Sequence, residues 1–148
     1  MHPFVDSQGY THTVTVSLTS YGDRVYSVCY VIYSILMQSV QPNRIILWLS
    51  EQEYNDENLP QSLKDLRSRG VEIAYCPDYR SYKKIIPTLR KYSEDVIITI
   101  DDDVLYGHET LEYLINAYLQ EPEYIWFMSG SKTVSYTHLR AHETVLDL

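Results

Sequence analysis

The sequence predicts an α/β fold, in which helices cover both faces of a mostly parallel β-sheet in a three-layer α/β/α sandwich. Two observations carry this prediction. Short runs of β-branched and apolar residues recur along the chain, and segments with apolar residues at helical spacing separate them. Strands that alternate with helices form parallel sheets, because each helix supplies the crossover between neighbouring strands. At 148 residues, the chain is long enough for one domain with a substantial core.

The first half of the chain predicts two strands and one helix. Residues 13–18 are expected to form the first strand, and residues 19–24 a turn-rich loop after it. Residues 25–38 carry apolar side chains at helical spacing and predict a helix. Residues 44–49 are the second predicted strand.

The second half continues the alternation. A short helix is expected over residues 61–69, with Gly70 as its C-terminal cap, and then a third strand over residues 71–75. Residues 81–92 predict a helix that Pro87 either kinks or restarts.

The last predicted elements are a fourth strand over residues 96–100, a helix over residues 110–119 and a short fifth strand over residues 124–127. The expected sheet order is 3-2-1-4, which leaves the fourth strand at an exposed edge.

Composition limits the function. The hydrophobic fraction of 45% and the charged fraction of 22% are typical of a globular protein. The net charge of −8 argues against a nucleic-acid partner, because proteins that bind nucleic acids present a basic surface. Neither a signal peptide nor a membrane span is predicted. Cys29 and Cys76 lack metal-ligand spacing and are expected to be buried thiols in a reducing compartment, which favours a cytoplasmic location.

Three consecutive carboxylates, Asp101, Asp102 and Asp103, directly follow the predicted fourth strand. Open α/β sheets bind ligands at the carboxyl ends of their strands. Adjacent carboxylates repel one another, and a divalent cation relieves this repulsion. The alternative is that these residues cap a helix N-terminus. No glycine-rich phosphate loop is present, so a phosphorylated ligand would need a metal ion and lysines.

Three segments resemble those of a known family. They are residues 16–24, 82–87 and 98–106. Together they make residues 13–127 similar to the N-terminal, nucleotide-sugar-binding half of GT-A glycosyltransferases, especially bacterial polysaccharide glycosyltransferases and, more distantly, exostosin-like enzymes. The resemblance implies a D-x-D motif in which Asp101 contacts the ribose or sugar and Asp103 binds Mn²⁺ or Mg²⁺. Asp102 would then lie behind Asp101 and Asp103 and support their positions without contacting the ligand or the metal itself.

The resemblance also places the nucleotide base at the loop after the first strand, near Thr19, Ser20, Tyr21 and Arg24. Tyr21 would stack on a uracil, which favours a UDP-sugar donor, and Arg24 would reach the base or the diphosphate. The alternative for this loop is an ordinary turn with a solvated arginine.

The lysines of the second segment are adjacent, so on a helix Lys83 and Lys84 point about 100° apart. We expect one of them, preferably Lys84, to reach the ligand and the other to be solvated. Asp78 and Arg80 are expected at the surface, and Trp48 in the core.

Residues 130–148 resemble a peptide that arises when sequencing-adapter DNA is translated. We therefore expect two parts: a partial GT-A domain over residues 1–129, and a non-native tail over residues 130–148. An amphipathic helix is the alternative for the tail. The acceptor half of a GT-A enzyme, with its catalytic base, would then lie outside this chain, so the fragment is expected to be weakly active or inactive.

The predicted activity of the parent protein is metal-dependent transfer of a sugar from a nucleotide-diphosphate donor to a glycan acceptor, in polysaccharide biosynthesis. Two alternatives stay open. One is a metal-dependent phosphohydrolase that uses the same acidic triplet, which would need a second carboxylate or histidine cluster. The other is a non-catalytic module that binds a nucleotide or a glycan.

Overall fold

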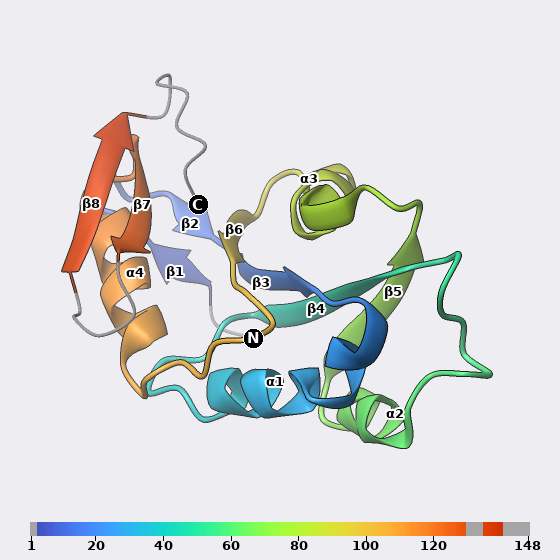
Figure 1. The fold of residues 1–148 in the computed structure, drawn as a ribbon. Coiled ribbons are helices and arrows are strands. Elements are labelled where there is room, and N and C mark those ends of the chain that lie inside the picture. Colours follow the sequence, from blue (N-terminus) through green and yellow to red (C-terminus); the bar gives the residue numbers. More distant parts are fainter. Residues whose placement is uncertain (1–2, 130–134, 141–148) are drawn as a thin grey trace.

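A computed structural model describes residues 3–129 and 135–140 of the chain (Figure 1). In chain order the elements are β1 (Phe4–Val5), β2 (Thr11–His12), β3 (Val14–Thr19), the 3₁₀ helix η1 (Gly22–Tyr26), α1 (Val28–Leu36), β4 (Arg44–Ser50), α2 (Gln61–Arg67), β5 (Val71–Cys76), the 3₁₀ helix η2 (Arg80–Lys84), α3 (Ile86–Lys91), β6 (Val96–Thr99), α4 (Thr110–Gln120), β7 (Tyr124–Ser129) and β8 (Ser135–Arg140).

The central sheet has four strands in the order β5-β4-β3-β6, and all three pairings are parallel. This confirms the predicted order 3-2-1-4 and the edge position of the fourth strand. The register places Val16 of β3 between Ile45 of β4 and Ile98 of β6. With β3 in the middle, its carboxyl end lies next to the carboxyl ends of β4 and β6.

Helices cover both faces of this sheet, as expected for an α/β sandwich. Figure 1 shows α1 and α2 on one side of the strands and α3 on the other. Apolar residues of α1, α2 and α4 join those of β3, β4 and β5 in one continuous core. A smaller cluster of Ile46, Trp48 and Cys76 lies on the opposite face, so the expected core position of Trp48 is confirmed.

Two predicted helices are each split into a 3₁₀ turn and an α-helix. The segment expected as one helix over residues 25–38 contains the end of η1, which begins at Gly22 in the predicted loop, then a break at Ser27, and α1. The segment over residues 81–92 contains η2 and α3, and Pro87 lies in the first turn of α3. Proline fits there because the first-turn N–H groups have no partner within the helix. Pro87 therefore restarts the helix rather than kinking it.

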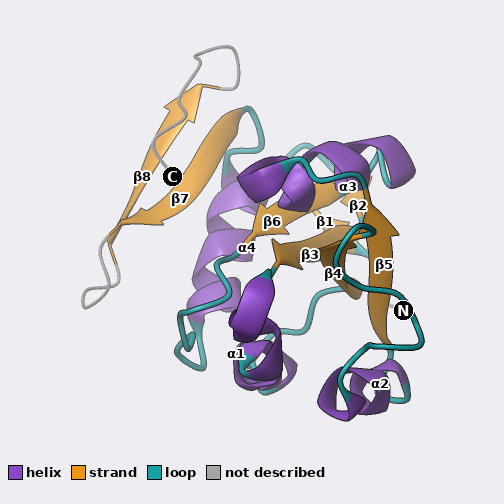
Figure 2. Cartoon of the chain, turned by 45° about the vertical axis from the view of Figure 1, so that its right-hand side comes forward, coloured by secondary structure: helices purple, strands orange, loops and turns teal. Residues whose placement is uncertain are grey.

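Two small antiparallel pairs accompany the main sheet. The pair β1-β2 has no counterpart in the sequence prediction and matches Phe4 with His12. The predicted fifth strand is present as β7, which pairs with β8 and not with the main sheet (Figure 2).

The expected non-native tail lies partly outside the described residues, which exclude 130–134 and 141–148. Its described part, β8, is a strand, so the alternative of a helix is wrong for these six residues. The adapter origin of residues 130–148 stays a prediction.

Both cysteines are buried free thiols, as predicted. Burial raises the pKa of the Cys76 thiol to about 11, which keeps it protonated at neutral pH. No helix within the described residues is long and apolar enough to cross a lipid bilayer.

Candidate functional site

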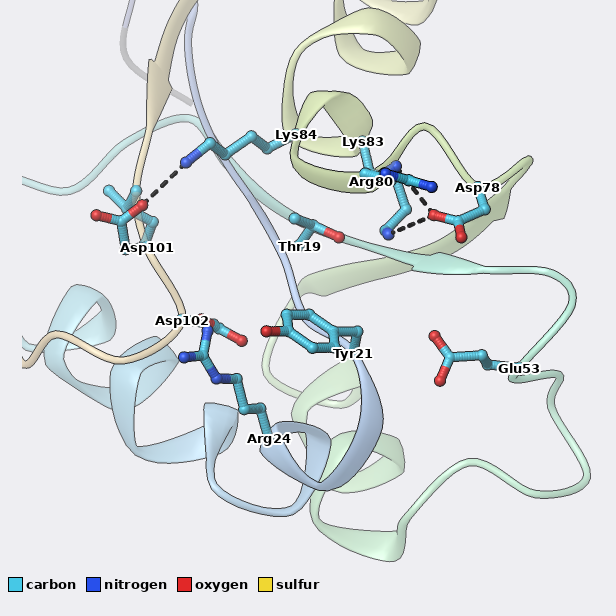
Figure 3. Close-up of a pocket in the computed structure, with 11 residues that line it drawn as sticks. Thr19, Tyr21, Arg24, Glu53, Asp78, Arg80, Lys83, Lys84, Asp101 and Asp102 are labelled. Atoms are coloured by element: carbon cyan, nitrogen blue, oxygen red, sulfur yellow. Dashed lines mark hydrogen bonds and ion pairs between the residues drawn. The ribbon is translucent and has the colours of Figure 1, made fainter. Parts of the chain in front are cut away.

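A cavity of about 470 Å³ opens at the carboxyl ends of the parallel strands (Figure 3). Its lining comes from the segments that follow all four strands: Thr19, Tyr21 and Arg24 at β3; Glu53 after β4; Asp78, Arg80, Lys83 and Lys84 after β5; Ile100, Asp101 and Asp102 after β6. Parallel strands all point their carboxyl ends to one edge, so this edge collects side chains that are far apart in sequence. Ligands of open α/β sheets bind at this edge.

The three consecutive carboxylates occupy three different environments. Asp101 is mostly exposed, and Lys84 Nζ lies 2.9 Å from its Oδ1 atom. Asp102 is buried and accepts hydrogen bonds from Ser20 Oγ at 2.8 Å and from Arg24 Nη1 at 3.1 Å. Asp103 is more than half exposed, with Arg24 Nη2 at 3.7 Å. Asp101 lines the cavity and is accessible to a ligand there, and Asp103, the predicted metal ligand, is exposed but is not part of the cavity lining. Asp102 holds the loop after β3.

The loop after β3 divides into anchored and accessible residues. Ser20 is buried beneath Asp102 and does not line the cavity, and the Thr19 hydroxyl donates to the Trp48 carbonyl at 2.8 Å. Tyr21 is exposed, and the Arg24 guanidinium lies 5.2 Å from the centre of its ring. Thr19, Tyr21 and Arg24 all line the cavity, and of these Tyr21 and Arg24 offer exposed side chains to a ligand.

Both lysines of η2 line the cavity, but in different ways. Lys84 pairs with Asp101, and Lys83 pairs with Asp78 at 3.0 Å. The expectation that one lysine is solvated is wrong, because Lys83 is 3% exposed. Figure 3 shows the two side chains diverging, Lys84 toward Asp101 and Lys83 toward Asp78, and both line the cavity.

Sequence reasoning missed four residues of the site. It did not consider Glu53 or Ile100, and it assigned Asp78 and Arg80 to the surface. Asp78 and Arg80 are indeed exposed, but they also line the cavity. No local pattern marks these positions, because they reach the site only through the parallel arrangement of β4 and β5.

Tyr106 is a fifth missed residue, although it belongs to the segment that carries the family resemblance. Its hydroxyl accepts a hydrogen bond from the Asp101 N–H at 2.8 Å. Burial, helped by the charges of the three nearby aspartates, raises the pKa of Tyr106 to about 12 against the lowering effect of that hydrogen bond. The neutral hydroxyl therefore fixes the backbone at the start of the acidic triplet.

The exposed carboxylates fit only part of a cation site. Within the described part of the chain, no three His, Cys, Asp or Glu side chains converge on one point. Mg²⁺ is commonly bound by one or two carboxylates together with substrate phosphates and water. Asp103 is exposed and offers one such carboxylate, so a cation held there would take its remaining ligands from the substrate and water.

Comparison with protein-family models and with curated proteins found no match to this chain.

Proposed function

We propose that this chain is the donor-binding part of a GT-A-type glycosyltransferase, which takes a sugar from a nucleotide diphosphate and passes it to a glycan acceptor. One observation carries the proposal. A cavity at the carboxyl edge of a four-stranded parallel sheet brings Asp101 and Asp102 together with Lys84 and Arg24. Cationic side chains beside carboxylates that could contact the sugar or a metal ion are the chemistry that a nucleotide diphosphate requires, which supports the proposal.

Each accessible side chain has a role in this proposal. Tyr21 offers an exposed aromatic face to a nucleobase, with a uridine nucleotide favoured. Arg24 and Lys84 are positioned for the phosphates. Asp101 would contact the ribose or sugar, and Asp103 would hold Mn²⁺ or Mg²⁺, which as a Lewis acid would stabilise the negative charge of the departing nucleoside diphosphate. The base that activates the acceptor is expected outside this chain.

The protein's own residues must rearrange to bind such a ligand. Lys84 is paired with Asp101, and this pair must open before Lys84 can contact a phosphate oxygen. Asp102 is held by Ser20 and Arg24, so it is expected to keep its place and to orient the Arg24 side chain.

Calorimetry with UDP, GDP and CDP, with and without Mn²⁺, tests the proposal. We expect UDP to bind most tightly, with Mn²⁺ increasing the affinity and Asp103→Ala abolishing that increase. Binding that is indifferent to Mn²⁺ and to Asp103→Ala would favour a non-catalytic binding module. Release of phosphate from simple esters would instead favour a phosphohydrolase.

Replacing Lys84 by methionine sharpens the test. Lys84→Met keeps most of the aliphatic chain but removes the charge. A hydrogen bond to a charged group contributes about 1.5–3 kcal/mol, so we expect the dissociation constant for UDP to rise about tenfold to a hundredfold. The free energy of unfolding should change by no more than about 1 kcal/mol, because the partner Asp101 is exposed.

Lys91→Met is the matched control. Lys91 also pairs with an acid, Glu72, but it does not line the cavity. Equal UDP affinities in the Lys84 and Lys91 variants would remove Lys84 from the binding site.

A further inference from the structure

The charges that line the cavity are almost all neutralised by one another. Four are cationic, on Arg24, Arg80, Lys83 and Lys84, and four are acidic, on Glu53, Asp78, Asp101 and Asp102. Three ion pairs join Arg24 with Asp102, Lys83 with Asp78, and Lys84 with Asp101. Among the described residues, Arg80 is the cation of the cavity that forms no ion pair with a carboxylate.

The backbone at Arg80 is strained. Its φ angle is +56°, and Arg80 is the one non-glycine residue with positive φ in the described part of the chain. A side chain in this left-handed region clashes with its own backbone, and such strain persists only where the surroundings impose it. Glycine is the residue normally found in this conformation.

Asp78 imposes the strained turn. Its Oδ1 atom accepts the Arg80 N–H at 2.9 Å and lies 3.0 Å from Lys83 Nζ. Lys83 is buried, so its charge requires this partner. The turn therefore holds Arg80 in an unfavourable conformation at the wall of the cavity, while the other cations of the cavity are already paired.

We propose that Arg80 binds a phosphate group of the ligand, and that the strained turn is kept because it aims this guanidinium into the cavity. The inference rests on the proposed function and assigns a phosphate contact that the family resemblance does not imply. Figure 3 shows Arg80 with Lys83 and Asp78 on one side of the cavity and the Lys84–Asp101 pair on another. A phosphate has no ion pair to break at Arg80, although this charge is near enough to Asp78 to help lower the pKa of that carboxyl, whereas Lys84, Lys83 and Arg24 must each first release a carboxylate.

Arg80→Gly separates ligand binding from folding, because it removes the guanidinium and relieves the strain in one change. We expect its melting temperature to rise by about 2–4 °C. Calorimetry should show the affinity for UDP falling about tenfold to a hundredfold, with any weak binding of uridine unchanged. Arg80→Lys, which keeps a charge without the planar fork, should bind UDP with intermediate affinity.

Arg90→Ala is the control for the loss of one positive charge, because Arg90 lies outside the cavity and packs on Tyr79. It should bind UDP like the unaltered chain.

Two results would overturn the inference and leave the proposed function standing. One is equal UDP affinity in Arg80→Gly and in the unaltered chain. The other is an equal loss of uridine and UDP binding in Arg80→Gly. If the unaltered chain bound none of UDP, GDP and CDP, both would fall. If Arg80→Gly did not fold, Arg80→Gln would decide by the same comparison of UDP affinities.

Discussion

The two faces of the central sheet differ in the side chains they bury. On β3, Val14, Val16 and Leu18 belong to the large apolar core shared with α1, α2 and α4. The alternate residues Thr15, Ser17 and Thr19 instead form hydrogen bonds: Ser17 with η2 and α3, Thr15 with Asp95 before β6, and Thr19 with the Trp48 carbonyl of β4. One strand therefore contributes hydrophobic burial to one layer and polar anchoring to the other.

The polar face anchors the segment that carries the lysines. Ser17 Oγ donates to the Lys84 carbonyl at 2.6 Å and lies 2.8 Å from Thr88 Oγ1, which in turn accepts from Trp48 Nε1 at 2.8 Å. No buried side-chain nitrogen or oxygen in the described structure is left without a partner. Hydrogen bonds are directional and hydrophobic contacts are not, so the polar face fixes where η2 lies while the apolar face supplies most of the stability.

The largest effect is expected on the apolar face. Leu47 is fully buried in β4 within the large core. Leu47→Ala should lower the free energy of unfolding by about 2–5 kcal/mol, because it removes buried surface and leaves a cavity. Urea denaturation measures this change. Under conditions where the variant is folded, its UDP affinity should equal that of the unaltered chain, and a loss of affinity would contradict the division of roles between the two faces.

An intermediate effect is expected from Thr88→Val on the polar face. The change keeps the shape of the side chain but leaves the buried Trp48 Nε1–H without its acceptor, at a cost of about 1–3 kcal/mol in unfolding free energy. Unlike Leu47→Ala, it should also weaken UDP binding in the folded protein, because the hydroxyl helps to hold η2.

A double-mutant cycle with Trp48→Phe checks the source of this effect. Removing both partners should cost less than the sum of the single changes. Strict additivity would show that the Thr88–Trp48 hydrogen bond is not the cause.

The smallest effect is expected in the pH dependence at Asp78. The Arg80 N–H and then Lys83 lower the pKa of this carboxyl below its ordinary value of 3.8. Its ionised form therefore stabilises the fold above about pH 4, and this contribution disappears as the pH falls through the lowered pKa.

Melting temperatures between pH 7 and pH 3 test this prediction. The difference in melting temperature between the unaltered chain and Asp78→Asn should shrink toward pH 3. The corresponding difference for Leu47→Ala should not shrink as Asp78 becomes protonated. A constant difference for Asp78→Asn would show that its charge is unimportant for the turn.

Much of the fold was predictable because local patterns specify it. The apolar runs at residues 44–49 and 96–100 identified two strands, although β4 is buried and the edge strand β6 is only half-buried. The expected cap at Gly70 is wrong, because α2 ends at Arg67 with Ser68 as its C-terminal cap, and Gly70 lies in the turn that follows with a φ angle of +88°. The pairing of β7 with β8 was not predictable, because antiparallel pairing depends on which segment is available in space and not on the strand's own pattern.

The site was only half predictable. The acidic triplet, the lysine pair and Tyr21 stood out by residue type and by their place after predicted strands. Glu53 and Arg80 did not, because an isolated charge in a loop resembles any solvated residue. The burial of Lys83 against Asp78 also depends on a turn whose strained backbone at Arg80 leaves no trace in the sequence.

The sequence by itself determined the four strands of the central sheet, their alternation with helices and the position of three carboxylates after β6, because periodicity and residue type are local properties. Only the tertiary structure decided which charges meet. Parallel pairing brings the ends of four strands to one edge, and there Asp101 contacts Lys84, Asp102 contacts Ser20 and Arg24, and Arg80 is left without a carboxylate. Contacts between residues up to 82 positions apart depend on strand order and register, which no single segment encodes.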